Sequence, residues 1–225
     1  SMKGYLFNSS LVFAGSMLGL LAGKKVPDGV KDAVFNALGL VTLYVGLKMG
    51  LNGTDVIPIV FSLALGTIAG SALRLEDRTS GALKRLNGAY LDGKHDTEGF
   101  LVASTLFCVG SMTIIGSLKD GLSSDGTLIQ TKSVMDGFAA FLLTAHYGVS
   151  VAFSALTVFV IQGSLTLFAK HLTFLTAPRM MSNIDGVGGI IVLAIGLNLL
   201  KVKQTKTIDM LPALILIVLY GLWVG

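Results

Sequence analysis

Apolar stretches long enough to cross a bilayer alternate with short polar connections along the whole chain. Charge-free runs extend from Tyr5 to Gly23 and from Val56 to Leu73, and between Gly137 and Ala169 only His146 can carry a charge. About 20 apolar residues are needed for a helix to span the hydrocarbon core. The pattern therefore predicts about eight membrane helices, over residues 5–23, 30–49, 55–74, 98–117, 133–147, 149–169, 183–200 and 208–224.

Composition places these helices in lipid. The chain is 52% hydrophobic and 13% charged, whereas a soluble domain carries about 25% charged residues. We expect an all-α integral membrane protein that crosses the membrane several times. Its net charge of +4 comes from lysines and arginines in short connections, which orient membrane helices, so we expect no nucleic-acid partner. The single cysteine, Cys108, excludes a disulfide within the chain.

Three stretches, 14–46, 109–148 and 162–196, share one order of features: a Gly-Ser within an apolar helix, a basic residue, a polar connection and a second apolar segment. Segments one to three and four to six form two copies, and segments six to eight form a third that shares segment six. Copies with an odd number of crossings lie in opposite orientations. We therefore predict one membrane domain of inverted three-helix repeats. The first repeat, with an interfacial loop, occupies residues 1–95, and the second and overlapping third occupy residues 96–225.

Small polar residues occur at related places in these copies. Asn36, Asp136 and Asp185 each precede small residues, in FNALG, MDGFA and IDGVG, within the middle segment, which is the short one of each copy. Short or glycine-interrupted segments mark the binding sites of many transporters, and carboxylates within a membrane usually serve ions or protons. We interpret Asp136 and Asp185 as residues that begin short helices meeting near the bilayer centre. The alternative is that they are N-caps at the membrane interface.

Further candidates lie on the same helical faces. Gly188 and Gly189 follow Asp185 by three and four residues, so another helix or a ligand can approach this face closely. Tyr147 follows Asp136 by eleven residues, and Gln162 is an amide within an apolar run. For these two the alternative is a hydrogen bond between helices.

The stretches 106–141, 149–169 and 176–200, together with DMLPAL at 209–214, resemble the bacterial membrane family called domain of unknown function 554 (DUF554). The resemblance implies a multi-pass inner-membrane protein expected to act in transport, without a defined substrate. Polar positions that recur in that family fall on residues of this chain, and the resemblance adds these to the candidates: Asp120, Gly121, Asp125, Lys132, Asp136, Gln162, Asn183 and Asp185.

The leading functional prediction is a secondary transporter of a small solute or ion. The alternatives are an ion channel, which needs a continuous polar path, and a membrane scaffold or sensor in which the glycines serve packing alone. We expect neither an enzyme nor a cofactor or metal site, because no converging nucleophile, base or metal-ligand set is present. The expected partners are an unidentified small-molecule or ion substrate, membrane lipid and, through GxxxG faces such as Gly15 to Gly23, a second copy in a homodimer.

Overall fold

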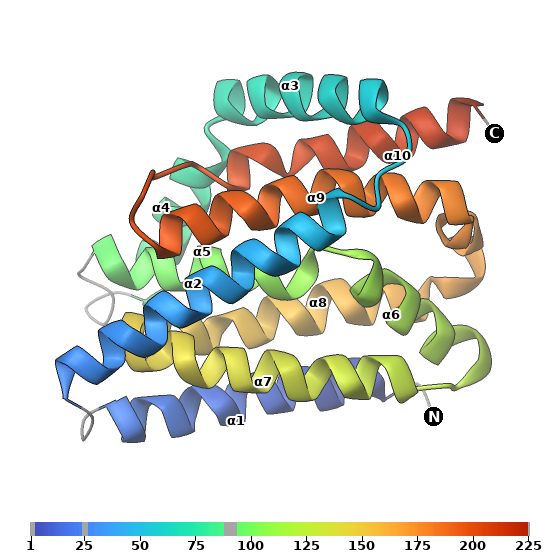
Figure 1. Cartoon of the computed structure of the whole chain (residues 1–225). Helices are drawn as coiled ribbons and strands as arrows, with labels where there is room; N and C mark the ends of the chain where they lie inside the picture. Colours follow the sequence, from blue (N-terminus) through green and yellow to red (C-terminus); the bar gives the residue numbers. More distant parts are fainter. Residues whose placement is uncertain (1–2, 24–26, 88–93, 225) are drawn as a thin grey trace. The chain divides into compact units, whose positions relative to one another are not determined.

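The computed structural model describes residues 3–23, 27–87 and 94–224, which form helices and connections and contain no strand (Figure 1). The α-helices are α1 (Gly4–Gly23), α2 (Asp28–Gly50), α3 (Val56–Leu73), α4 (Leu75–Asn87), α5 (Lys94–Cys108), α6 (Ser111–Ser123), α7 (Thr127–Tyr147), α8 (Ser154–Leu167), α9 (Pro178–Leu199) and α10 (Pro212–Val224). Short 3-10 helices lie between them: η2 (Gly148–Phe153), η3 (Ala169–His171), η4 (Thr173–Thr176) and η5 (Ile208–Met210).

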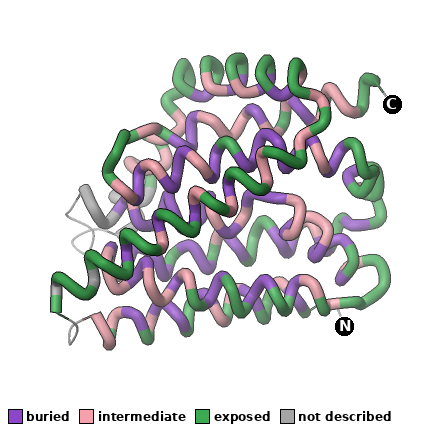
Figure 2. The backbone as a smooth tube through the Cα atoms, in the orientation of Figure 1, coloured by how far each residue is buried: buried purple, intermediate pink, exposed green. Residues whose placement is uncertain are grey.

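The helices carry the surface expected of a protein in lipid. Within the described residues, five helical stretches are long and apolar enough to cross a membrane, or six if the bent pair α5–α6 counts as one. Along α3 the buried positions are Ile59, Ser62, Gly66 and Gly70, while large side chains such as Phe61, which is 61% exposed, cover the other faces (Figure 2). Exposed apolar faces of this kind meet lipid. The prediction of an all-α membrane protein is confirmed, whereas the eight crossings and the inverted repeats stay predictions.

The chain forms two compact units, each assembled from separated stretches. Unit 1 comprises residues 1–38 and 87–173, and unit 2 comprises residues 39–86 and 174–225. The continuous helix α2 therefore contributes its first part to unit 1 and its second part to unit 2. The predicted division into repeats at residues 95 and 96 concerns similarity between copies, and it stays a prediction.

In unit 1, α1 and α7 pack closely along a face of small residues. A side chain added at Gly15 would meet the carbonyl oxygen of Gly137, and one added at Gly19 would meet the carbonyl oxygen of Phe141. Only glycine allows two helix backbones to approach this closely. Because the matched positions rise together along both helices, α1 and α7 run parallel.

A second neighbour of α1 is α8, and it runs in the opposite direction. The hydroxyl of Ser9 donates to the carbonyl of Ala155 (3.0 Å), whereas the earlier residue Tyr5 lies against the later residue Gly163. Residues 127–167 are one apolar stretch by composition, but the chain turns back at η2, which begins at Gly148 with φ 81°. The separate segments predicted at 133–147 and 149–169 therefore run in opposite directions.

In unit 2, the glycines that follow Asp185 serve helix packing. A side chain at Gly189 would meet the backbone nitrogen of Gly50 and the carbonyl oxygen of Gly46, and one at Gly196 would strike Leu43. The glycine face of α9 thus seats the second part of α2, and these two segments run antiparallel. The same unit contains a reciprocal pair of caps, because the amide of Glu76 donates to the carboxylate of Asp209 (2.9 Å) and Glu76 accepts from the amide of Ile208 (3.1 Å).

The prediction that the middle segment of each repeat is short is wrong. The helices α2, α7 and α9 contain 23, 21 and 22 residues. Asn36, Asp136 and Asp185 consequently lie inside helices, not at their beginnings, and neither aspartate is an N-cap. The predicted segment 133–147 begins directly after Lys132, whereas α7 begins at Thr127 and includes Lys132, whose charge is compensated by Asp136.

Candidate functional site

A buried ion pair lies within α7. The ammonium nitrogen of Lys132 is 2.6 Å from Oδ2 of Asp136, and each residue is only 7% exposed. Their spacing of four residues places both on one face of the helix. Removing two charges from water costs several kcal/mol per ion. Each of these two charges is therefore stable inside the protein only while the other lies close to it.

Two amide side chains extend the ion pair across unit 1. Nδ2 of Asn8, on α1, donates to Oδ2 of Asp136 (3.0 Å) and to Oε1 of Gln162 on α8 (3.0 Å). Asn8 and Gln162 are both fully buried. Lys132, Asp136, Asn8 and Gln162 together form what we call the unit 1 polar cluster, to which three helices contribute.

A broken helix supplies the next contact of this cluster. The helix α5 ends at Cys108 and α6 begins at Ser111, with a bend of 60° at the break, where Gly110 adopts φ 118°. Carbonyls in the last turn of a helix have no partner within that helix. The carbonyl of Phe107 accepts instead from the ammonium of Lys132 (2.8 Å) and from the hydroxyl of Thr113 (3.0 Å). The ion pair is therefore attached to the point where α5–α6 unwinds.

Several buried polar atoms of unit 1 have no hydrogen-bond partner among the described residues. Two belong to the polar cluster, Oδ1 of Asn8 and Nε2 of Gln162. The others are hydroxyls of Ser16, Thr97, Ser117, Thr144, Ser150 and Thr166. An unsatisfied buried polar group costs about 1–3 kcal/mol, so native proteins keep few of them without a role. Next to the ion pair, one acceptor and one donor therefore remain without a hydrogen bond among the described residues.

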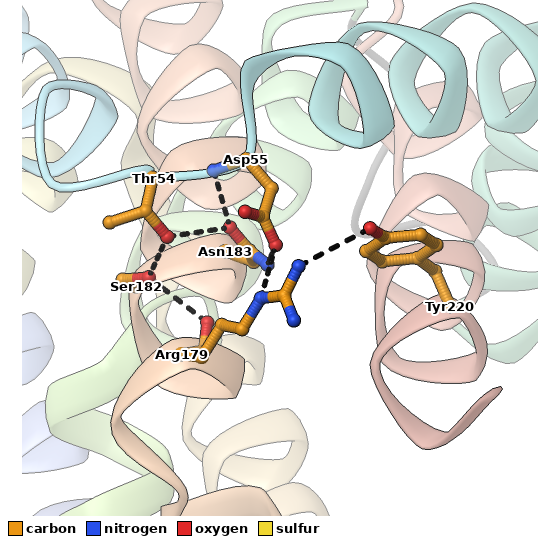
Figure 3. A network of polar contacts seen from close by, with 6 residues as sticks. All are labelled: Thr54, Asp55, Arg179, Ser182, Asn183 and Tyr220. Atoms are coloured by element: carbon orange, nitrogen blue, oxygen red, sulfur yellow. Dashed lines mark hydrogen bonds and ion pairs between the residues drawn. The ribbon is translucent and has the colours of Figure 1, made fainter. Parts of the chain in front are cut away.

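Unit 2 has its own network, at the beginning of α9 (Figure 3). Oδ2 of Asp55, which precedes α3, accepts from Nε of Arg179 (2.7 Å) and from Nδ2 of Asn183 (2.8 Å). The backbone amide of Asp55 donates to Oδ1 of Asn183 (3.1 Å). The hydrogen bond from Arg179, followed by that from Asn183, holds the pKa of Asp55 below its usual value of 3.8. This network fixes the connection between α2 and α3 on α9.

The rest of this network is open to the surroundings. The hydroxyls of Thr54 and Ser182 lie 2.9 Å apart, and Arg179 reaches the hydroxyl of Tyr220 at 3.5 Å (Figure 3). The side chain of Arg179 is 55% exposed, in contrast to the buried Lys132. The two ion pairs therefore have nearly the same length and very different surroundings.

Asp185 lies further along α9, in its third turn. It is 8% exposed, and Nδ2 of Asn52 donates to its Oδ2 at 3.4 Å. The adjacent Gly186 contacts Gly53, so the carboxylate sits where the end of α2 and the connection to α3 cross α9. Asp185 and Asp136 belong to different units, and the prediction that they meet near the bilayer centre stays a prediction.

The structure brings together only some of the predicted residues. Asp136 and Gln162 share the unit 1 polar cluster, while Asn183 and Asp185 lie on α9 in unit 2 with the packed Gly188 and Gly189. Tyr147 lies about 16 Å along α7 from Asp136, since each helical residue rises about 1.5 Å. Its hydroxyl donates to Glu98 (3.3 Å). Asn36 is exposed on α2, outside the polar cluster.

The hydrophobic pattern does not select the site residues Asn8, Asp55 and Arg179, and Lys132 is a candidate only through the family resemblance. The pattern places Lys132 in a connection, but its spacing of four residues from Asp136 is the signal of a helical ion pair. Asn8 is an amide within an apolar run, as Gln162 is, and its selection needs knowledge of which helices pack together. Asp55 and Arg179 are separated by 124 residues, and no local pattern joins them.

A bundle of apolar helices that encloses charged and amide side chains is the architecture of an all-α membrane protein with a polar interior. The chain belongs to the family described as "Protein of unknown function (DUF554)", whose sequence profile matches residues 3–222. It is similar to the "Uncharacterized membrane protein YdfK" of Bacillus subtilis (strain 168), with 32% identity over 96% of this chain and 93% of that protein. It is also similar to the "Uncharacterized protein YqgA" of Escherichia coli (strain K12), with 26% identity over 95% and 93% of the two chains. No solved structure matches it significantly.

Proposed function

We propose that this protein is a secondary transporter of a small solute or ion, multi-pass in the inner membrane, and that the unit 1 polar cluster is its binding site. The observation that carries the proposal is the buried Lys132–Asp136 ion pair, attached to the break between α5 and α6. Ionisable residues within membrane segments usually mark a substrate or ion pathway. Transporter sites are typically built from discontinuous helices with unwound backbone.

The two unpartnered amide atoms support the same proposal. A scaffold that needed only tight packing has no use for Oδ1 of Asn8 and Nε2 of Gln162 without partners, because apolar side chains of similar size pack there at lower free energy. A binding site uses such atoms, since a solute that supplies one donor and one acceptor satisfies both. Asp185 is a second candidate binding residue, to be tested by itself with Asp185→Asn.

The test begins with a thermal-shift screen of the purified protein against amino acids, carboxylates, sugars and inorganic ions. Compounds that stabilise the protein are then used, radiolabelled, in proteoliposomes. Uptake that saturates with concentration and is abolished by Asp136→Asn supports the proposal. Asp32→Asn is the matched control, because Asp32 is an exposed carboxylate of the same unit and its loss is expected to leave uptake intact.

The same vesicles distinguish the alternatives. Fast flux that does not saturate and carries current indicates a channel. Absence of flux for every stabilising compound, with the protein folded and correctly inserted, leaves a scaffold or sensor and contradicts the proposal. Gln162→Leu is expected to weaken substrate binding by about 1–3 kcal/mol, because a hydrogen-bonding group is lost from a site shielded from water.

A further inference from the structure

The ammonium group of Lys132 sits among oxygen atoms in the manner of a bound cation. It contacts Oδ2 of Asp136 at 2.6 Å and the carbonyl oxygen of Phe107 at 2.8 Å. One oxygen carries the compensating negative charge, and the other comes from the end of a broken helix. Carboxylates and unwound backbone carbonyls are the ligands with which transporters hold sodium ions.

The amide of Asn8 lies beside the same carboxylate. Asn8 uses its Nδ2 to donate to Asp136 and Gln162, and its Oδ1 is buried without a partner among the described residues. The cradle therefore consists of the Asp136 carboxylate on α7 and the Phe107 carbonyl at the end of α5, and the hydrogen bond from Asn8 holds the carboxylate in place. A single positive charge balances its single carboxylate.

We propose that this cradle is a monovalent-cation site that Lys132 fills with its own ammonium group. The chain thus carries a tethered cation where a related site would bind a free alkali ion. This inference rests on the transport function proposed above, and it means that transport requires neither sodium nor potassium at this site. The cradle itself is a property of the folded protein and is tested without any substrate.

The experiment removes the tether. Lys132→Ala deletes the ammonium and leaves its oxygen partners, so an external cation of the right size is expected to bind in its place. The thermal unfolding midpoint of purified wild type and variant is measured at constant ionic strength in the chlorides of lithium, sodium, potassium, methylammonium and N-methyl-D-glucamine. The last cation is too large for the cradle and serves as the reference.

Lys132→Ala is expected to gain about 5 °C in saturating sodium or methylammonium relative to the reference, because a ligand that binds only the folded state raises its stability. Wild type is expected to shift by less than about 1 °C, since its cradle is already full. The double variant with Lys132→Ala and Asp136→Asn is expected to show no rise in its unfolding temperature in sodium or methylammonium, because the compensating carboxylate is gone. Lys119→Ala, which removes an exposed lysine of α6, is the matched control and is expected to behave as wild type.

Each outcome of this experiment either supports or contradicts the cation site. The inference is overturned if Lys132→Ala unfolds at the same temperature in every chloride, or if wild type shows the same selectivity, because the pair is then an ordinary structural ion pair. Recovery of folded Lys132→Ala only when sodium or methylammonium is present supports it. If Lys132→Ala cannot be obtained folded in any of the cations, while the double variant with Lys132→Met and Asp136→Asn folds, the result contradicts the cation site. A cation response without any transport would leave the cradle standing and reject the proposed function alone.

Discussion

Two ion pairs of nearly equal length, one buried and one exposed, provide a direct test of how burial sets the strength of a charge pair. Lys132–Asp136 and Arg179–Asp55 have N–O distances of 2.6 and 2.7 Å. Their side-chain exposures are 8% and 9% in the first pair and 55% and 19% in the second. A double-mutant cycle on each pair, with Lys→Met or Arg→Met and Asp→Asn, measures the coupling free energy between the partners.

The expected magnitudes differ several-fold. Breaking a buried pair by removing one partner costs about 3–5 kcal/mol, because the other charge is left buried without compensation. Removing both charges from α7 is expected to cost less than about 2 kcal/mol, since the amide that replaces the Asp136 carboxylate still accepts from Asn8. The coupling in α7 is thus expected to be about 3 kcal/mol or more, and the coupling in the exposed pair is expected to be much smaller because solvent screens it.

Reversible unfolding in mixed micelles, with increasing SDS and tryptophan fluorescence or circular dichroism as the signal, gives these free energies. The single variants Lys132→Met and Asp136→Asn must each be less stable than the double variant for the reasoning to hold. If the effects of the two substitutions in α7 simply add, the ion pair does not compensate two buried charges. A coupling at Arg179–Asp55 as large as that in α7 would show that burial is not the deciding variable.

Three further predictions use the same unfolding assay. Gly15→Ala is expected to destabilise the protein by about 1–3 kcal/mol, because the new methyl group meets the backbone of α7. Gly81→Ala, in α4, has open space around it and should stabilise the protein by up to about 1 kcal/mol. Equal effects of the two substitutions would contradict the packing argument. Because the pKa of Asp55 is lowered in the folded state, its contribution to stability is present above about pH 3.8 and is lost as the pH falls through the folded-state pKa. Asp55→Asn should therefore reduce the loss of unfolding free energy at low pH. The same loss at low pH in wild type and variant would refute this. Tyr147→Phe removes the hydrogen bond to Glu98 and should cost about 0.5–1.5 kcal/mol while leaving uptake intact, and a variant that folds without uptake would return Tyr147 to the binding site.

The class of protein was predictable because lipid imposes a simple rule on composition. Every long apolar run of the sequence became helical, and the face of α3 that carries Phe61 is exposed as a lipid-facing helix requires. Helix ends were predicted poorly because the pattern sets boundaries at charged residues. Whether Lys132 ends a helix or continues inside it depends on Asp136, Asn8 and Phe107, and two of these three partners are distant in sequence.

The broken helix α5–α6 also shows that the local sequence does not determine where a helix ends. Gly-Ser pairs begin at Gly15, Gly70, Gly110, Gly116 and Gly163, and nothing in their local sequence distinguishes one as a helix break. In the structure α1, α3, α6 and α8 continue through their pairs, and of these five pairs only the one at Gly110, where φ is 118°, lies at a helix break. Glycine permits a break, but the contacts of the surrounding helices decide whether one forms, and these contacts are not written in the local pattern.

The long-range contacts of Asn8 have a consequence for how the chain is made. Its partners Asp136 and Gln162 are 128 and 154 residues further along. At about 5–20 residues per second, the ribosome adds the first of them about 6–26 s after Asn8 itself. During that interval a polar amide in an otherwise apolar helix has none of its final partners. Water or the insertion machinery is therefore expected to satisfy the amide of Asn8 until α7 and α8 have been made.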